Sequence, residues 1–419
     1  MSGRRTVRFF LLAALLIGGP LGAEAAPERL DPRKLAESYF AAPASDRARI
    51  LGSLEPFDRI AAADVEGWKK NLLAWAGKGS RVSGKGKGFL YEKPDRGLYL
   101  LGGRKPSDGL LVALHGGGAG AGDAGQAASA FGGAASSLGF RMVAPEVLEK
   151  TEHGWTDPSD TERFVMDLIE AVIRTEKIDR NRVVLTGHSM GGYGTWTLGA
   201  IYADVFAGLA AFAGAPTCTR TSAAAPISGV AEGVLPNLRN VPIFVYQSGD
   251  DQNVPCPSND FAMPQLDRLA QNDPGGYVHL YERVEGRAHG FPEKGVDPGI
   301  AWASKRPRDP RPKKTVWQPS RAWKNQFYGL YWERPALGTV VTVEWKGDNR
   351  FEVSSDGPID GLEILLDART VDLAKEVVVT SGGKETFRGI ATLSLRTMVR
   401  TAERGDPDLV FTASVPAGK

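Results

Sequence analysis

The sequence around Ser189 sets the tightest constraint on how this chain folds. An apolar run, Val183–Thr186, is followed by Gly187-His188-Ser189-Met190-Gly191-Gly192, and a helical pattern then extends from Met190 to about Ile201. A glycine two positions to either side of the serine lets a strand and a helix pass closely, and the sharp turn between them holds the serine hydroxyl clear of the sheet edge. The pattern predicts a strand, a strained turn and a helix in direct succession.

Further strands and helices are predicted to alternate on both sides of this turn. Ser159 to about Lys177 opens with a capping box and carries apolar side chains at helical spacing. Such alternation favours a mainly parallel sheet covered by helices on both faces, over residues 81–303. Six short apolar runs are the strand candidates: Leu110–Leu114, Arg141–Ala144, Val183–Thr186, Gly208–Phe212, Ile243–Gln247 and Val278–Tyr281.

The composition changes on both sides of this central region. Residues 26–80 carry apolar side chains at helical spacing, which predicts an N-terminal helical segment. Residues 304–324 contain four prolines and eight lysines and arginines, and we expect a solvated linker there, with a surface for acidic polymers as the alternative. Residues 325–419 alternate like strands between turn residues, which predicts a C-terminal all-β domain resembling a sandwich.

Residues 1–25 have the features of a secretory signal peptide. Three arginines precede an apolar stretch, Phe9–Ile17, and Ala23-Glu24-Ala25 offers a small-residue cleavage site. This stretch is far shorter than the roughly 20 apolar residues that span a bilayer, so no membrane span is expected once the segment is removed. The mature protein is then expected in the periplasm or outside the cell.

Charge and composition narrow the classes of partner. The chain has 51 Lys+Arg against 49 Asp+Glu, and loss of residues 1–25 would leave it formally neutral. This balance argues against a nucleic-acid binder. The spacing of the five histidines does not suit a metal site, and two cysteines are too few for a thiolate site, so neither a metal nor an organic cofactor is expected.

Ser189 has the partners that nucleophilic catalysis requires. A serine hydroxyl becomes a nucleophile when a base accepts its proton. His289 lies in a loop just past the last predicted strand and is predicted as that base, whereas His279 lies inside the strand and is predicted to be structural. The imidazole needs a carboxylate to orient it. Asp250 and Asp251, in the loop after the preceding strand, both qualify.

Glycines after an early strand are predicted to supply backbone donors. His115-Gly116-Gly117-Gly118 follows Leu110–Leu114, and glycines there let amide groups approach a substrate. Acyl transfer needs such donors for its oxyanion. We therefore predict an oxyanion hole from the amides near Gly116, Gly117 and Met190.

The sequence says less about the roles of the other three histidines. His115 and His188 are expected to orient or pack against their neighbours. His153 is expected on a loop that either borders the pocket or faces solvent.

The stretch Leu111–Pro292 resembles the α/β-hydrolase superfamily. Residues 182–196 are similar to secreted esterases and prolyl-oligopeptidase-like proteins, near dienelactone hydrolases and feruloyl or polyhydroxybutyrate esterases. The resemblance covers a little under half of the chain and implies an eight-stranded sheet and a Ser-His-Asp triad. The spacing Asp-x-x-Val-Pro recurs in this class of hydrolase and makes Asp251 the predicted acid in preference to Asp250.

The resemblance implies a serine carboxylic-ester hydrolase that works through an acyl-enzyme. Small esters, polyesters and acetyl or feruloyl esters of polysaccharides are the candidate substrates. One alternative is a prolyl-oligopeptidase-like peptidase, although about 60 residues before the strands are too few for the propeller of such enzymes. Another is a non-catalytic hydrolase-fold protein whose C-terminal domain binds carbohydrate or a cell-surface partner.

The two cysteines are expected to form a disulfide beside the pocket. Cys218 follows the strand Gly208–Phe212, and Cys256 ends the loop that contains the two candidate acids. Both positions lie at the same edge of the predicted sheet, and disulfides persist in exported proteins.

Overall fold

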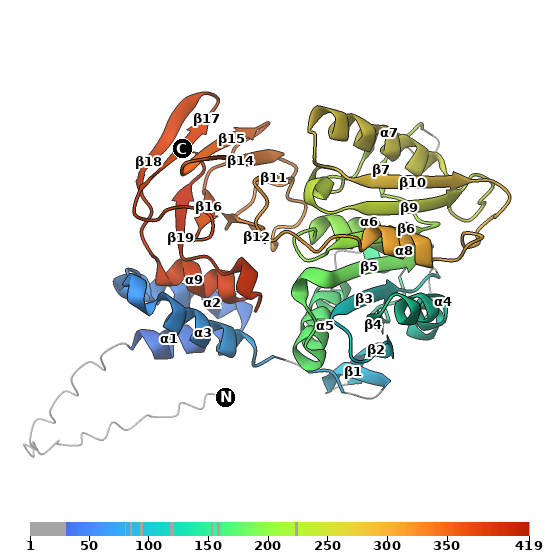
Figure 1. Ribbon diagram of the computed structural model, residues 1–419, viewed down its shortest axis with the longest axis horizontal. Helices are drawn as coiled ribbons and strands as arrows, with labels where there is room; N and C mark the ends of the chain where they lie inside the picture. The colour runs from blue at the N-terminus through green and yellow to red at the C-terminus, as the bar shows by residue number, and fades with distance from the viewer. Residues whose placement is uncertain are drawn as a thin grey trace, which may run out of the picture.

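Eight strands form one sheet across the middle of the chain in the computed structural model (Figure 1). In the order β1-β2-β4-β3-β5-β6-β9-β10, the strands from β4 to β10 run parallel, whereas β1 and β2 are antiparallel to their neighbours. The predicted fold class, a mainly parallel eight-stranded sheet flanked by helices, is confirmed. The strands are β1 (Lys87–Glu92), β2 (Asp95–Gly103), β3 (Gly109–Leu114), β4 (Phe140–Pro145), β5 (Val183–His188), β6 (Gly208–Phe212), β9 (Ile243–Ser248) and β10 (His279–Val284).

The structure describes residues 31–79, 81–83, 86–92, 95–117, 121–151, 154–156, 160–222 and 225–418. The predicted signal peptide, residues 1–25, lies outside the described residues, as do Gly118 and His153.

The central strands match their predictions because they are buried on both faces. Every residue of β3, β4 and β9 is buried, and such strands read as continuous apolar runs. The two strands at one edge, β1 and β2, are not among the predicted strands. β2 contains Gly97, Gly102 and Gly103, and glycine is depleted in strands, so its sequence gives a weak signal.

Helices cover both faces of this sheet. Leu111 and Ala113 of β3 pack in one cluster with α4 (Ala124–Ser137) and α8 (Asp297–Ala303). The alternate residues of β3 face the other side, where α5 (Asp160–Glu176), α6 (Met190–Ile201) and α7 (Pro257–Asn272) pack. Successive side chains of a strand point to opposite faces, so one strand contributes to both cores.

Two further sheets pack face to face in the C-terminal region. The first has the order β11-β14-β15-β17-β18 and the second the order β12-β13-β16-β19. Their buried side chains, among them Trp317, Trp332 and Phe351, belong to one cluster, as expected for a sandwich. The strands are β11 (Lys314–Trp317), β12 (Gln326–Phe327), β13 (Leu330–Trp332), β14 (Val341–Gly347), β15 (Arg350–Ser355), β16 (Leu362–Leu366), β17 (Glu376–Ser381), β18 (Lys384–Ile390) and β19 (Ala413–Pro416). A short pair, β7 (Cys218–Thr219) and β8 (Gly229–Val230), lies within residues 81–303, which hold the eight-stranded sheet and which we call the α/β region.

The C-terminal region also contains a helix, which the prediction of an all-β domain missed. This helix, α9 (Leu395–Ala402), shares a core with the N-terminal helices α1 (Pro32–Ala41), α2 (Ala44–Ser53) and α3 (Val65–Ala76). Figure 1 shows these blue helices beside the red α9. The N-terminal helical segment therefore packs with the C-terminal region.

Residues 304–324 are part of the fold and do not form the expected solvated linker. They include β11, and the side chains of Arg308 and Lys324 are buried. Arg308 pairs with Asp406, and Lys324 pairs with Asp204. The partners of these basic residues lie far away in the sequence, so local composition gave no sign of the pairing.

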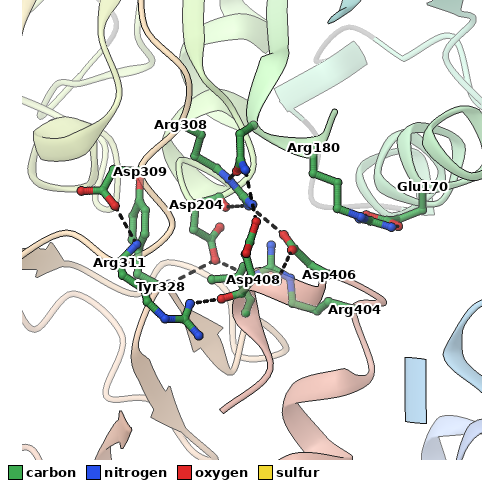
Figure 2. Close-up of polar contacts among 12 residues, drawn as sticks. Glu170, Arg180, Asp204, Arg308, Asp309, Arg311, Tyr328, Arg404, Asp406 and Asp408 are labelled. Atoms are coloured by element: carbon green, nitrogen blue, oxygen red, sulfur yellow. Dashed lines mark hydrogen bonds and ion pairs between the residues drawn. The ribbon is translucent and has the colours of Figure 1, made fainter. Parts of the chain in front are cut away.

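Asp204 is the centre of a buried polar network that we call the Asp204 clamp (Figure 2). Lys324 Nζ donates to both carboxylate oxygens of Asp204, at 3.1 and 2.9 Å, and Arg404 and the amide of Tyr328 also donate to Oδ2. Arg308 Nη1 donates to the Asp204 carbonyl at 2.7 Å and to Asp406 at 2.8 Å. The clamp joins the α/β region, residues 304–324 and the C-terminal region.

We expect Asp204→Asn to lower the free energy of unfolding by about 3–5 kcal/mol, because it leaves buried cations without their anion. Urea unfolding, followed by tryptophan fluorescence, measures the change. Glu385→Gln is the matched control, since Glu385 pairs with Arg388 at an exposed site on β18 and its loss should change little.

The stability difference between wild type and Asp204→Asn should depend on pH. Burial alone would raise the pKa of Asp204, but Arg404 and Lys324 lower it to about 2, below the ordinary value of an aspartate. The stabilisation is therefore fully present between about pH 4 and pH 7 and is lost as the pH falls towards 2. Above pH 7 it weakens, because burial lowers the pKa of Lys324 to about 7 and this partner then loses its charge. The stability difference between wild type and Asp204→Asn should shrink over both ranges. A difference that stays constant would contradict an ionised Asp204.

Candidate active site

Ser189 lies at the turn between β5 and α6, as predicted. Its φ of +58° is rare for a residue other than glycine and has to be supported by its surroundings. A Cβ atom on Gly187 would lie 2.3 Å from the carbonyl oxygen of Gly191, and one on Gly191 would lie 2.2 Å from that of Leu114. Only glycine fits at these two positions, so the strand and the helix can approach as closely as this turn requires.

The structure brings Ser189, His289 and Asp251 together at the carboxyl ends of the parallel strands. Ser189 Oγ lies 2.9 Å from His289 Nε2, and His289 Nδ1 lies 2.8 Å from Asp251 Oδ2. A carboxylate only accepts, so Nδ1 carries the proton. Nε2 is then free to accept the proton of the serine hydroxyl, which is the tautomer that a general base needs.

Asp251 is a buried carboxylate with fixed partners. Its Oδ1 accepts hydrogen bonds from the amides of Asn253 and Val254, at 2.8 and 2.9 Å. Burial alone would raise its pKa, but hydrogen bonds from His289 and these amides keep the pKa below its ordinary value. Asp251 is therefore ionised and oriented, as the partner of an imidazolium must be.

Gln247 also positions Asp251, and it was not among the predicted site residues. Its Nε2 donates to Asp251 Oδ2 at 3.2 Å and to the Val254 carbonyl at 2.8 Å, and its Oε1 accepts from Asn259. It therefore holds the Asp251 loop against the end of β9. A polar side chain at the end of an otherwise apolar, buried strand is the signal that could have identified it.

The predicted glycine loop lies beside the serine. A Cβ atom on Gly116 would lie 3.4 Å from Ser189 Cβ, so this loop runs next to Ser189. Gly117 has a φ of +120°, which favours glycine. Met190 is the first residue of α6, where amide groups have no acceptor within the helix. The positions predicted for an oxyanion hole therefore adjoin Ser189.

His115 orients this glycine loop. The Val147 amide donates to His115 Nε2 at 3.2 Å, so Nδ1 carries the proton and donates to the Gly116 carbonyl at 2.7 Å. Burial lowers the pKa of His115, which favours this neutral form. The Gly116 carbonyl and the Gly117 amide share one planar peptide and point in opposite directions. His115 therefore sets the direction of the Gly117 N–H.

His188 packs against the predicted base, and His279 does not reach it. His188 Nε2 donates to the carbonyl of His289 at 3.2 Å, and its ring lies 4.3 Å from that of Phe291. Burial and the neighbouring His289 lower the pKa of His188 to about 4, so it is neutral near pH 7. His279 is bonded to Asp267 at the opposite end of β10.

The expected disulfide is absent. Cys218 and Cys256 are both free thiols. Cys218 Sγ lies 4.0 Å from the carbonyl of Ser258, whereas Cys256 Sγ lies 3.6 Å from Arg283 Nη2 on β10. The two side chains meet different partners, although both lie near the start of α7.

Within the ranges that the structure describes, no three or more His, Cys, Asp or Glu residues are grouped so that they could hold a metal ion. No helix in these ranges is long and apolar enough to cross a membrane.

Comparisons with known proteins find likenesses in structure alone. No protein-family model matches the chain, and no curated protein does. A thermostable esterase is 24% identical over 51% of this chain with a TM-score of 0.38, and the match covers 60% of that esterase. Esterase PE8 is 17% identical over 50% of this chain and 98% of its own, with a TM-score of 0.37. A CE1 ferulic acid esterase from Anaeromyces mucronatus is 16% identical over 51% of this chain and 87% of its own, with a TM-score of 0.36.

We expect Gly191→Ala to destabilise the protein by about 3 kcal/mol, because the new methyl group would collide with the Leu114 carbonyl. Thermal unfolding monitored by circular dichroism measures the change. Gly133→Ala is the matched control: Gly133 lies within α4 with open space around it. That variant should be more stable by about 0.5–1 kcal/mol. Equal stability of the two variants would contradict the close approach at Ser189.

Proposed function

We propose that this protein is a serine carboxylic-ester hydrolase. The observation that carries the proposal is the continuous set of hydrogen bonds from Ser189 through His289 to the buried Asp251. This arrangement activates a hydroxyl for attack on a carbonyl carbon. The glycine loop and the first amide of α6, on either side of the serine, suit the oxyanion that such an attack creates.

The reaction follows from the positions of these groups. Ser189 Oγ attacks the ester carbonyl while His289 Nε2 takes its proton, and Asp251 stabilises the imidazolium that results. Amides near Gly116, Gly117 and Met190 hold the negative charge on the carbonyl oxygen. His289 then protonates the leaving alcohol, and water hydrolyses the acyl-enzyme with His289 again acting as base.

Ester substrates are proposed as a class. The candidates are small esters, polyesters and acetyl or feruloyl esters of polysaccharides. A panel of p-nitrophenyl esters of increasing acyl length, together with feruloyl and acetyl polysaccharides, would separate them. Chromogenic peptides would be assayed in parallel, and a preference for peptides over esters would favour the peptidase alternative.

We expect Ser189→Ala to lower kcat by about 10⁶-fold on any ester that the wild type hydrolyses, because the nucleophile is lost. Initial rates on p-nitrophenyl acetate and labelling by a fluorophosphonate probe give the two readouts. Ser136→Ala on α4 is the matched control, since Ser136 is exposed and its hydroxyl donates to the Gly132 carbonyl of its own helix. Equal rates for Ser189→Ala and wild type would refute the role of Ser189.

We also propose that the protein is exported with loss of residues 1–25. The basic start and the short apolar stretch before Ala25 support this proposal. Expression of the full chain in a Gram-negative bacterium should place a protein beginning at Ala26 in the periplasm, as judged by intact mass. A protein that retains residues 1–25 in the cytosol would contradict the proposal.

A further inference from the structure

The loop that carries His289 follows an edge strand of the sheet. We define the His289 loop as residues 285–291, which follow β10, the last strand in the sheet order. Residues 285–288 are exposed. Packing therefore contributes little to holding this stretch, and its position has to come from polar contacts.

Two side chains at the end of β9 bind three successive amides of this loop. Asp250 Oδ1 accepts hydrogen bonds from the amides of Gly286 and Ala288, both at 3.1 Å. The amide between them, that of Arg287, donates to Ser248 Oγ at 3.1 Å, and the Ser248 hydroxyl donates to Asp250. Successive amides that converge in this way form a concave site for an anion, which the Asp250 carboxylate occupies.

The backbone of the loop would not hold this shape without support. Gly286 and Ala288 have φ values of +77° and +46°. Alanine is disfavoured in this left-handed region. Ala288, immediately before His289, therefore has a backbone conformation that alanine disfavours, and the bond from its amide to Asp250 opposes relaxation. Bonds within the loop, from the Gly290 amide to the Arg287 carbonyl and from the Arg287 side chain to the Phe291 carbonyl, support the same turn.

The other side of the loop is held at His289 itself. His188 donates to the His289 carbonyl at 3.2 Å, and the centres of the two rings lie 4.8 Å apart. The backbone on both sides of the His289 imidazole is therefore held: His188 binds the His289 carbonyl, and Asp250 binds the amide of Ala288. The two ring nitrogens of His289 then meet Ser189 and Asp251.

We propose that Asp250 is a positioning residue that keeps His289 aligned between Ser189 and Asp251. This inference rests on the proposed function. The two adjacent carboxylates have separate tasks: Asp251 supplies a charge to the imidazole, whereas Asp250 supplies acceptor oxygen to the loop backbone. The hydrogen bond from Ser248, assisted by the loop amides, lowers the pKa of Asp250, so the acceptor is a carboxylate throughout the neutral range.

Three variants distinguish these tasks. Asp250→Ala removes the acceptor and should lower kcat for p-nitrophenyl acetate by about 10²-fold with little change in KM, because misplacement of a catalytic group affects the chemical step. Asp250→Asn keeps an acceptor oxygen and should recover most of that loss. Asp251→Asn removes the charge beside the imidazole and should lower kcat by about 10⁴-fold without such recovery.

Asp267→Ala is the matched control for these variants. It removes another exposed carboxylate, bonded to His279 at the opposite end of β10, and should leave kcat unchanged. Circular dichroism melting of all variants checks that each protein folds. Asp250 is exposed, so its substitution should not unfold the protein.

Hydrogen exchange of residues 285–289 tests the contact independently of activity. In Asp250→Ala these amides should exchange at least about 10-fold faster than in wild type, with Asp250→Asn in between. Unchanged exchange in Asp250→Ala would overturn the proposal whatever the protein hydrolyses. So would a kcat for Asp250→Asn as low as that for Asp250→Ala, because charge would then matter more than the acceptor. A wild type that neither hydrolyses esters nor reacts with a fluorophosphonate would refute the proposed function, even if the exchange result supports the contact.

Discussion

One buried carboxylate connects the three parts of this protein. Asp204 follows α6 in the α/β region, yet the groups that neutralise it, Lys324 and Arg404, come from residues 304–324 and from the turn after α9. A buried charge is stable only when it is paired and hydrogen-bonded. Detachment of any one of these segments would therefore leave a buried charge on another without its partner. α6 begins directly after Ser189 and ends just before Asp204. The clamp therefore also fixes the far end of the helix whose first turn borders Ser189.

The site itself depends on the parallel direction of the central strands. β3, β5, β9 and β10 all end at the same edge of the sheet, and the residues that follow them are the glycine loop, Ser189, the Asp250–Asp251 pair and the His289 loop. The glycine loop is held by its own His115, which bonds to the Gly116 carbonyl and the Val147 amide. The His289 loop is held by His188 and Asp250, which bond to the backbone of His289 and Ala288. Loops that follow separate strands can thereby hold Ser189, His289 and Asp251 in an arrangement that no single segment of the sequence specifies.

Features that depend on residues close together in the sequence could be predicted, whereas contacts between distant residues could not. The turn at Ser189 depends on residues within a few positions of one another, and the buried strands read as apolar runs, so both are visible in the sequence. The edge strand β2, with its glycines, gives a weak signal. The basic residues of 304–324 resemble a solvated stretch because their carboxylate partners lie far away in sequence, as Arg308 and Asp406 do. The contact of Asp250 with the His289 loop was invisible for the same reason: sequence spacing can rank two adjacent aspartates as acids but does not show which backbone amides either one meets.

The packing of α1–α3 on α9 changes how the C-terminal region relates to the site. Tyr39 and Leu72 from the N-terminal helices share a core with Met398 of α9, so the α/β region lies in sequence between two parts of one packed unit. Both ends of the α/β region thus lead into the same packed unit, and the Asp204 clamp adds a third attachment. A binding module on a flexible linker searches a wide volume around its enzyme. Here the connecting segment contributes a strand and the buried, paired side chains of Arg308 and Lys324, so it does not act as a flexible linker to the C-terminal sheets.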